Sequence, residues 1–163
     1  FEVAHNAKKP FTVSSEHQEI EVLGTIFNVT NYPGDRIVET VLKSGSVKIT
    51  YQKGRGKKVK LTPGNLSSFN IKSSKIKTKK VNVNDYFSWR SGFLSLETNS
   101  LTEIMTKLSR YYNFEFTIQN KDLANQTFSG KLELKDDIQQ IVQVLRETTE
   151  FDLQIINNNI ITK

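Results

Sequence analysis

Short alternating runs of apolar and polar residues fill the first half of the chain. In residues 20–22 and 47–51 every second residue is apolar, and most of these residues are β-branched or aromatic. A period of two places one face of a strand in a core and the other in solvent. Similar runs lie at residues 26–29 and 41–42, and no clean helical period of about 3.6 occurs before residue 97. The pattern predicts an all-β region.

Turns punctuate these strands, and Gly24 and Gly64 stand at two of them. A glycine at such a position can adopt positive φ without steric cost, so we expect both glycines to do so. Two architectures fit the strands: a twisted, solenoid-like roll and a sandwich of two sheets. We favour the roll.

The second half changes to the period of an amphipathic helix. Five apolar residues share one helical face: Leu101, Ile104, Met105, Leu108 and Tyr112. Ser100 and Glu103 have the spacing of a capping box, which satisfies two backbone amides at a helix start. We therefore predict a helix after Ser100, followed by a strand at residues 114–118.

The same pattern recurs 37 residues later. Seven apolar positions coincide at this offset: Leu101 with Ile138, Ile104 with Ile141, Met105 with Val142, Leu108 with Leu145, Phe114 with Phe151, Phe116 with Leu153 and Ile118 with Ile155. Predicted strands at residues 93–96 and 128–134 precede the two helices, and residues 160–161 form a terminal strand. The pattern predicts a small α+β domain of duplicated β-α-β units that pack together.

The change of period places an all-β domain at residues 1–88 and an α+β domain at residues 89–163. Residues 1–88 include 15 basic and 7 acidic residues. Residues 89–163 include 8 basic and 10 acidic residues. Residues 43–80 hold twelve basic residues, eleven of them Lys, and no acidic one. We expect this segment to attract an acidic partner.

Three of these lysines, Lys75, Lys77 and Lys79, fall on one side of a predicted strand. A row of lysines protects an edge strand against pairing with another edge, because like charges oppose association. The same row can serve as a docking surface for an acidic protein. We favour edge protection and keep docking as the alternative.

The chain is poor in residues for catalysis or metal binding. It has no Cys and two His, His5 and His17, neither of which begins a metal-binding motif. The acidic pair Asp136 and Asp137 fits a helix start, where carboxylates are favoured. We therefore expect no enzyme activity, no cofactor and no metal site.

Several motifs follow one another along the chain in an order that resembles a known family. They are Lys9-Pro10-Phe11-Thr12-Val13, Ile20-Glu21-Val22-Leu23-Gly24-Thr25-Ile26-Phe27-Asn28-Val29, Leu42-Lys43-Ser44-Gly45-Ser46-Val47, Leu61-Thr62-Pro63-Gly64, Trp89-Arg90-Ser91-Gly92-Phe93, Leu101-Thr102-Glu103-Ile104 and Leu108-Ser109-Arg110-Tyr111-Tyr112. Together they resemble the FecR family, whose members are membrane-spanning anti-sigma factors that control extracytoplasmic-function sigma factors. The family more often has Trp where Tyr111 stands. The form Gly-Thr-Xaa-Phe-Asn-Val is similar to members from Bacteroidetes-like bacteria.

The resemblance implies a signalling role in the periplasm. Family members carry a cytoplasmic anti-sigma domain, a transmembrane helix and a periplasmic region, which is contacted by the signalling domain of a TonB-dependent outer-membrane transducer. Residues 89–163 resemble the small signalling (STN-like) domain of such transducers and of secretins. Phe1 is not a natural start, and no apolar run reaches the roughly 18 residues of a membrane span, so we expect a soluble sensor part of a longer, membrane-anchored protein.

The residues expected to contact the partner come from both halves of the chain. They are Trp89, Phe93, Arg110, Tyr111, Lys75, Lys77 and Lys79. For most of the rings among them we favour core packing over a role in binding. Two other functions stay open: direct sensing of a glycan or peptidoglycan, and nucleic-acid binding by the lysines. Nucleic acid ranks last, because modules that track phosphates favour Arg and interleaved aromatic residues.

Overall fold

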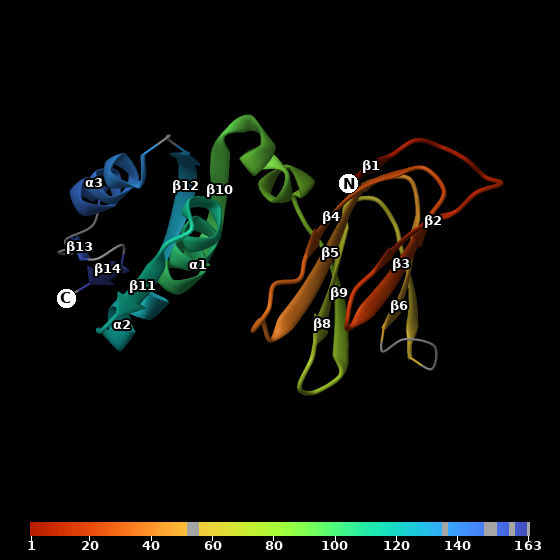
Figure 1. Cartoon of the computed structure of the whole chain (residues 1–163), viewed down its shortest axis with the longest axis horizontal. Helices are drawn as coiled ribbons and strands as arrows, with labels where there is room; N and C mark the ends of the chain where they lie inside the picture. Colours follow the sequence, from red (N-terminus) through yellow and green to blue (C-terminus); the bar gives the residue numbers. More distant parts are fainter. Residues whose placement is uncertain (52–55, 135–136, 149–152, 157–158, 163) are drawn as a thin grey trace. The chain divides into compact units, whose positions relative to one another are not determined.

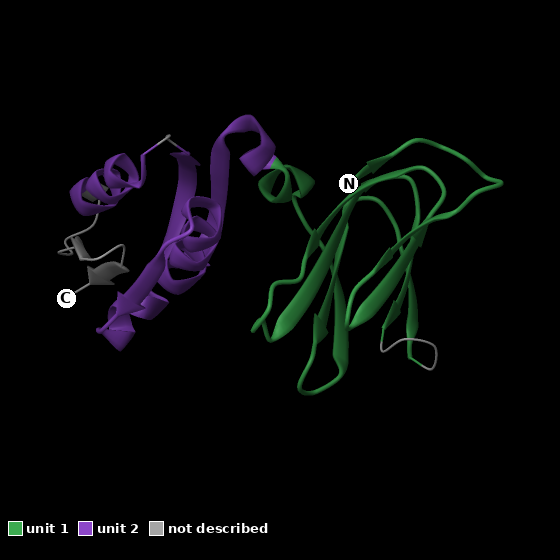
Figure 2. Ribbon diagram, in the orientation of Figure 1, with its two compact units in different colours: residues 1–87 green, residues 88–163 purple. Residues whose placement is uncertain are grey.

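The chain forms two compact units, residues 1–87 and 88–163 (Figure 2). The structure is a computed structural model, and it describes all residues except 52–55, 135–136, 149–152, 157–158 and 163. The predicted boundary lay one residue later, between residues 88 and 89.

Unit 1 consists of two antiparallel sheets (Figure 1). The five-stranded sheet has the order β1 (Glu2–Val3), β4 (Thr25–Thr30), β5 (Ile37–Ser44), β8 (Asn65–Asn70) and β9 (Lys75–Lys80). The four-stranded sheet has the order β2 (Phe11–Ser14), β3 (Gln18–Val22), β6 (Val47–Tyr51) and β7 (Lys58–Leu61). The strands expected from the period-two pattern are all present.

The two sheets bury their apolar faces against each other. Ile20 and Ile49 from the four-stranded sheet share one core with Phe27, Leu42 and Phe69 from the five-stranded sheet. Unit 1 is therefore a sandwich, the second of the two predicted architectures, and the preference for a roll was wrong. The chain alternates between the sheets, one hairpin at a time.

The two turn glycines have different reasons to be glycine. Gly64 has a φ of 82°, as predicted, and an added Cβ there would meet no atom. Gly24 does not have positive φ, so the prediction was wrong at this position. An added Cβ at Gly24 would instead collide with the backbone of His5, 2.5 Å from its Cα. The close approach of two chain segments therefore excludes a side chain at residue 24.

Two buried polar contacts join the sheets through the core. Gln18 on β3 and Thr40 on β5 exchange side-chain hydrogen bonds of 3.3 and 3.4 Å. The Tyr51 hydroxyl on β6 shares a bond of 2.8 Å with the Ser67 hydroxyl on β8. All four residues are almost fully buried, so each group needs the other to replace its lost water.

A second, smaller cluster lies on the outer face of the five-stranded sheet. Val41 and Leu66 alternate with the core-facing residues of β5 and β8, and Phe87 covers them. The covering segment includes the short 3₁₀ helix η1 (Val83–Tyr86), which is capped by the side chain of Asn82. The end of unit 1 is thus held on its own sheet.

Unit 2 combines three helices with two small sheets. Its elements are η2 (Ser88–Ser91), β10 (Phe93–Ser100), α1 (Leu101–Tyr112), β11 (Glu115–Ile118), α2 (Lys121–Asn125), β12 (Thr127–Glu133), α3 (Ile138–Thr148), β13 (Leu153–Ile156) and β14 (Asn159–Thr162). Strands β10 and β12 pair antiparallel, and β14 lies between β11, to which it is parallel, and β13, to which it is antiparallel. The order of helices and strands matches the predicted one, with α2 as an additional helix.

The helix predicted after Ser100 is confirmed in detail. Ser100 accepts a bond from the Glu103 amide at 3.2 Å, and Glu103 accepts one from the Ser100 amide at 2.9 Å, which completes the capping box. The apolar face packs into the core of unit 2, where Leu108 is fully buried. Asn113 ends the helix with a left-handed backbone, φ 54°.

The second predicted helix, α3, contributes Ile141, Val142 and Leu145 to the same core. Its first turn is capped by Asp137, whose carboxylate accepts a bond from the Gln139 amide at 2.9 Å. Asp136 lies outside the described residues, as does Phe151 of the following predicted strand. Symmetric packing of two duplicated units stays a prediction.

Replacement of Leu108 by Ala should lower the free energy of unfolding by about 2–5 kcal/mol, because it removes buried methyl groups and leaves a cavity in the core of unit 2. Urea unfolding followed by circular dichroism measures the change. Val144→Ala is the matched control: Val144 lies on α3 and is 39% exposed, so its change should stay within about 0.5 kcal/mol. Equal stability of Leu108→Ala and the parent would show that this face is not a core.

Burial raises the pKa of Tyr51 above its usual 10.0, although the bond with Ser67 lowers it in part. The folded state therefore holds the phenol proton more tightly than the unfolded state. The resulting stability is fully present below pH 10.0 and is lost as the pH rises through the folded-state pKa.

Tyr51→Phe should cost about 1–3 kcal/mol at neutral pH, because the Ser67 hydroxyl loses its buried partner. The difference in unfolding free energy between parent and variant should shrink at alkaline pH, since only the parent has this titrating group. Unfolding curves at neutral pH and above pH 10 test both points. A difference that stays constant across this range would contradict the buried phenol.

Candidate protein-binding surfaces

Trp89 and Phe93 lie together at the start of unit 2. Trp89 is part of η2, and the Gly92 amide donates to the Trp89 carbonyl at 3.2 Å, which closes the turn into β10. The Ser95 amide donates to the Ser88 hydroxyl, also at 3.2 Å, and fixes η2 against the strand. Trp89 is 49% exposed. The favoured interpretation, that this ring packs in a core, is therefore wrong for Trp89.

Phe93 lies on the outer face of the β10–β12 pair. Its neighbour Leu94 is buried opposite Leu132, so the alternation of the strand turns Phe93 away from that core. The ammonium group of Lys131 lies 3.7 Å from the centre of the Phe93 ring, within the range of a cation–π contact. Glu133 stands directly opposite Phe93 in the register. The outer face of this strand pair therefore combines a half-buried ring with exposed side chains of both charges.

Arg110 and Tyr111 lie in the last turn of α1. Tyr111 is 51% exposed and contacts the Tyr112 ring edge to face, with 4.8 Å between the ring centres. Tyr112 is half-buried against the core of unit 2, so it holds its neighbour in place. Arg110 is half-buried, and its charge interacts favourably with the carboxyl end of the helix.

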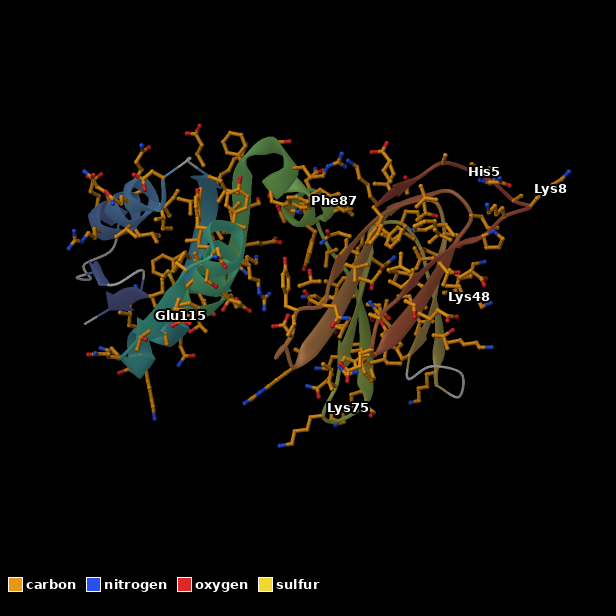
Figure 3. The ribbon with its side chains drawn as sticks, in the orientation of Figure 1. His5, Lys8, Lys48, Lys75, Phe87 and Glu115 are labelled. Atoms are coloured by element: carbon orange, nitrogen blue, oxygen red, sulfur yellow. The ribbon has the colours of Figure 1, made fainter. Side chains whose placement is uncertain are left out.

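The lysines Lys75, Lys77 and Lys79 belong to unit 1, where they share one face of β9. This strand pairs with β8 on one side and is an edge of the five-stranded sheet. All three side chains are exposed, and Lys77 and Lys79 stand opposite Ser68 and Leu66. Figure 3 marks Lys75 at the β8–β9 hairpin. The predicted row of lysines on an edge strand is therefore present.

The structure thus groups the predicted contact residues into two pairs and one row. Trp89 and Phe93 lie in neighbouring elements at the start of unit 2, and Arg110 and Tyr111 lie in the last turn of α1. Lys131 was not among the predicted residues, although it covers the Phe93 ring. The sequence pattern places Lys131 in a predicted strand. The register that brings this strand opposite β10 could not be predicted from the sequence.

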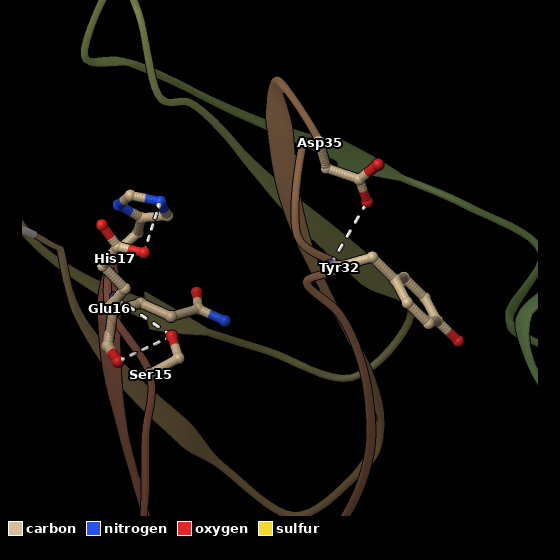
Figure 4. A network of polar contacts seen from close by, with 6 residues as sticks. Ser15, Glu16, His17, Tyr32 and Asp35 are labelled. Atoms are coloured by element: carbon tan, nitrogen blue, oxygen red, sulfur yellow. Dashed lines mark hydrogen bonds and ion pairs between the residues drawn. The ribbon is translucent and has the colours of Figure 1, made fainter.

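A polar network at two turns of unit 1 is structural (Figure 4). The Ser15 hydroxyl donates to the Gln18 carbonyl at 3.2 Å, and the Tyr32 amide donates to the Asp35 carboxylate at 3.4 Å. His17 lies 3.8 Å from the carboxylate of its neighbour Glu16. Among the described residues, no three His, Asp or Glu side chains gather in a way that could hold a metal ion.

One open cavity of about 220 Å³ lies beside this network in unit 1. Its lining is Phe1, Val13, Ser15, Gln18, Ile20, Val29 and Asn31. These residues come from both sheets, so no local sequence signal marks the cavity. None of the lining side chains is ionisable.

Comparisons with known proteins identify both the C-terminal part and the fold. Residues 93–162 match the model of the family described as FecR, C-terminal. Two crystal structures of a proposed anti-sigma factor from Parabacteroides distasonis ATCC 8503, at 1.65 and 2.50 Å resolution, are similar to the chain with TM-scores of 0.82 and 0.81. Both are 20% identical, and the match covers 99% of this chain and 74% of the other. At this identity the likeness shows the fold. No curated protein matches the sequence significantly.

Helices long and apolar enough to cross a membrane are absent from the described residues.

Proposed function

We propose that this chain is the periplasmic sensor region of a FecR-type anti-sigma factor, because residues 93–162 match the FecR C-terminal family and the fold is similar to that of a proposed anti-sigma factor. In this role it receives a signal by direct contact with the signalling domain of a TonB-dependent outer-membrane transducer. The signal then passes through a transmembrane helix to a cytoplasmic domain that regulates an extracytoplasmic-function sigma factor. The family is a regulatory, non-enzymatic class of protein.

The observation that carries this proposal is the extent of the family match. Residues 93–162 coincide with nearly all of unit 2, which spans residues 88–163. FecR-type anti-sigma factors are anchored in the inner membrane and carry a periplasmic region, and a folded unit of this family is expected on that side. The proposed STN-like character of unit 2 would make it similar to the transducer domain that it contacts.

Unit 2 offers two features suited to a protein partner. Trp89 and Tyr111 are large exposed rings, a residue type that often dominates the binding energy of an interface. Strands β10 and β12 form a sheet of two strands, so within the described residues each has a backbone edge that no other strand pairs with. A strand of the partner can extend such a sheet.

The positive charge of unit 1 supports association with the proposed partner. The twelve basic residues between residues 43 and 80 give unit 1 a positive field, which speeds association with an acidic protein surface. The lysines of β9 alternate with Ile76 and Thr78, not with aromatic rings, so the pattern suits a protein partner better than a nucleic acid.

Direct sensing of a glycan or peptidoglycan is the alternative, and it is less well supported. A sugar needs several hydrogen-bonding groups, whereas the cavity of unit 1 is lined by four apolar residues and three polar ones, of which Ser15 and Gln18 already bond within the protein. A thermal-shift screen with oligosaccharides separates the two functions, because a ligand of the folded state raises the melting temperature.

The test of the proposed function is binding to the signalling domain of a TonB-dependent outer-membrane transducer from the same organism. Trp89→Ala and Tyr111→Ala should each weaken binding about tenfold or more, because each removes an exposed ring from the contact. Isothermal titration calorimetry measures the dissociation constants.

Tyr32→Ala is the matched control, since Tyr32 is 48% exposed but belongs to unit 1. It should bind as the parent does. Absence of any binding by the parent would refute the transducer as partner. Unchanged affinity of both unit 2 variants would refute this docking surface.

A further inference from the structure

The outer edge of β9 combines exposed charge with backbone groups that no described strand pairs with. On the side away from β8, no strand in the described part of the chain pairs with it. Its sequence is Lys-Ile-Lys-Thr-Lys-Lys, with no acidic residue. The side chains of Lys75, Lys77 and Lys79 have no carboxylate within ion-pair distance among the described residues.

The register determines which backbone groups face this open edge. The Val81 amide donates to the Gly64 carbonyl at 2.9 Å, so the backbone of residue 81 points toward β8. In an antiparallel ladder this direction repeats every second residue. Lys75, Lys77 and Lys79 therefore also point their amides and carbonyls toward β8. Ile76 and Thr78 point theirs outward.

The side chains of β9 divide between two faces. Lys75, Lys77 and Lys79 stand opposite Asn70, Ser68 and Leu66 on the outer face of the sheet. Ile76 lies on the other face, where it is half-buried against the sandwich core. A strand added beside β9 would meet a row of charge on one face and the rim of an apolar core on the other.

We propose that β9 binds an extended, acidic segment of a partner protein as an additional antiparallel strand. Residues of that strand opposite Ile76 and Thr78 exchange backbone hydrogen bonds with them. Residues opposite Lys75, Lys77 and Lys79 then form the pairs without backbone bonds, in which side chains lie closest. The geometry selects a segment in which Asp or Glu alternates with apolar residues.

The protein contains one pairing of this kind within unit 1. On β3, Glu19 and Glu21 alternate with Ile20 and Val22, and Glu21 lies directly opposite Lys48 on β6. The Lys48 ammonium group lies 3.2 Å from the Glu21 carboxylate. Unit 1 therefore already contains a strand in which acidic and apolar residues alternate, paired with a strand that carries lysine.

The same lysines prevent the β9 edge from pairing with another basic strand. A second copy of β9 would place Lys opposite Lys, which opposes self-association. Edge protection and selective docking are therefore two consequences of one row of charge. This inference deepens the electrostatic part of the proposed function, but it does not require that the transducer binds unit 2.

A synthetic peptide, Thr-Glu-Ile-Glu-Val-Glu-Thr, tests the proposal on the full chain. Its binding is followed by NMR at about 50 mM salt, where charges are weakly screened. On binding, the Ile76 and Thr78 amides should become protected from hydrogen exchange. The Lys75, Lys77 and Lys79 amides, which already bond to β8, should change little. The transducer is not present, so this result is independent of the test on unit 2.

Two matched peptides separate strand pairing from charge attraction. N-methylation of the Ile and Val residues removes the amides that face β9 and should abolish binding, whereas N-methylation of the central Glu should leave it. A peptide with Lys in place of each Glu should not bind. Equal binding by the two methylated peptides would overturn the proposal, because a purely ionic contact does not need those amides.

A matched pair of protein variants locates the site. Lys77→Glu, in the middle of the row, should weaken peptide binding about fivefold, since one attractive pair becomes repulsive. Lys8→Glu changes the net charge equally but lies far from Lys75 in unit 1 (Figure 3), and it should bind as the parent does. No binding of the acidic peptide to the parent, or equal loss in both variants, would refute the site on β9.

Discussion

The fold of unit 1 depends on buried polar side chains that form hydrogen bonds across the interior of its sandwich. Gln18 bonds to Thr40 and Tyr51 to Ser67, and each pair joins one sheet to the other. A buried group without its partner costs about 1–3 kcal/mol, a large fraction of the stability of a small domain. A slip of one residue in any of these strands would move its polar side chain to the opposite face. The pairs therefore hold the register of β3, β5, β6 and β8.

The register of these strands determines which side chains unit 1 exposes. Because β8 is held by Ser67 and by Phe69 in the core, its neighbour β9 must turn Ile76 inward and its lysines outward. The charge of the edge strand is thus a consequence of the packing of the interior. The packing of the core therefore decides which backbone groups and which charges the edge strand presents.

The surface of unit 2 differs from that of unit 1, but its exposed side chains are held by an equally well packed interior. The capping box and the buried face of α1 hold the helix, and its last turn then exposes Tyr111 while Tyr112 packs inward. On β10 the burial of Leu94 places Phe93 outside, under Lys131. The exposed rings are therefore rigidly supported, which lowers the entropy lost on binding. Such surfaces fit the proposed role, in which the protein acts by contact with a partner.

The sequence by itself determined the local structure. Alternation in residues 20–22 and 47–51 predicted strands, and Ser100 with Glu103 predicted a capped helix, because these signals involve neighbours within a few positions. The tertiary structure decided which strands pair, that the sheets form a sandwich, and that Gly24 is required by the approach of His5. It also decided that Lys131 covers Phe93. Strand pairing and close approach join residues far apart in the chain, and many pairings satisfy the same local pattern. Only the joint packing of the whole core selects one of them.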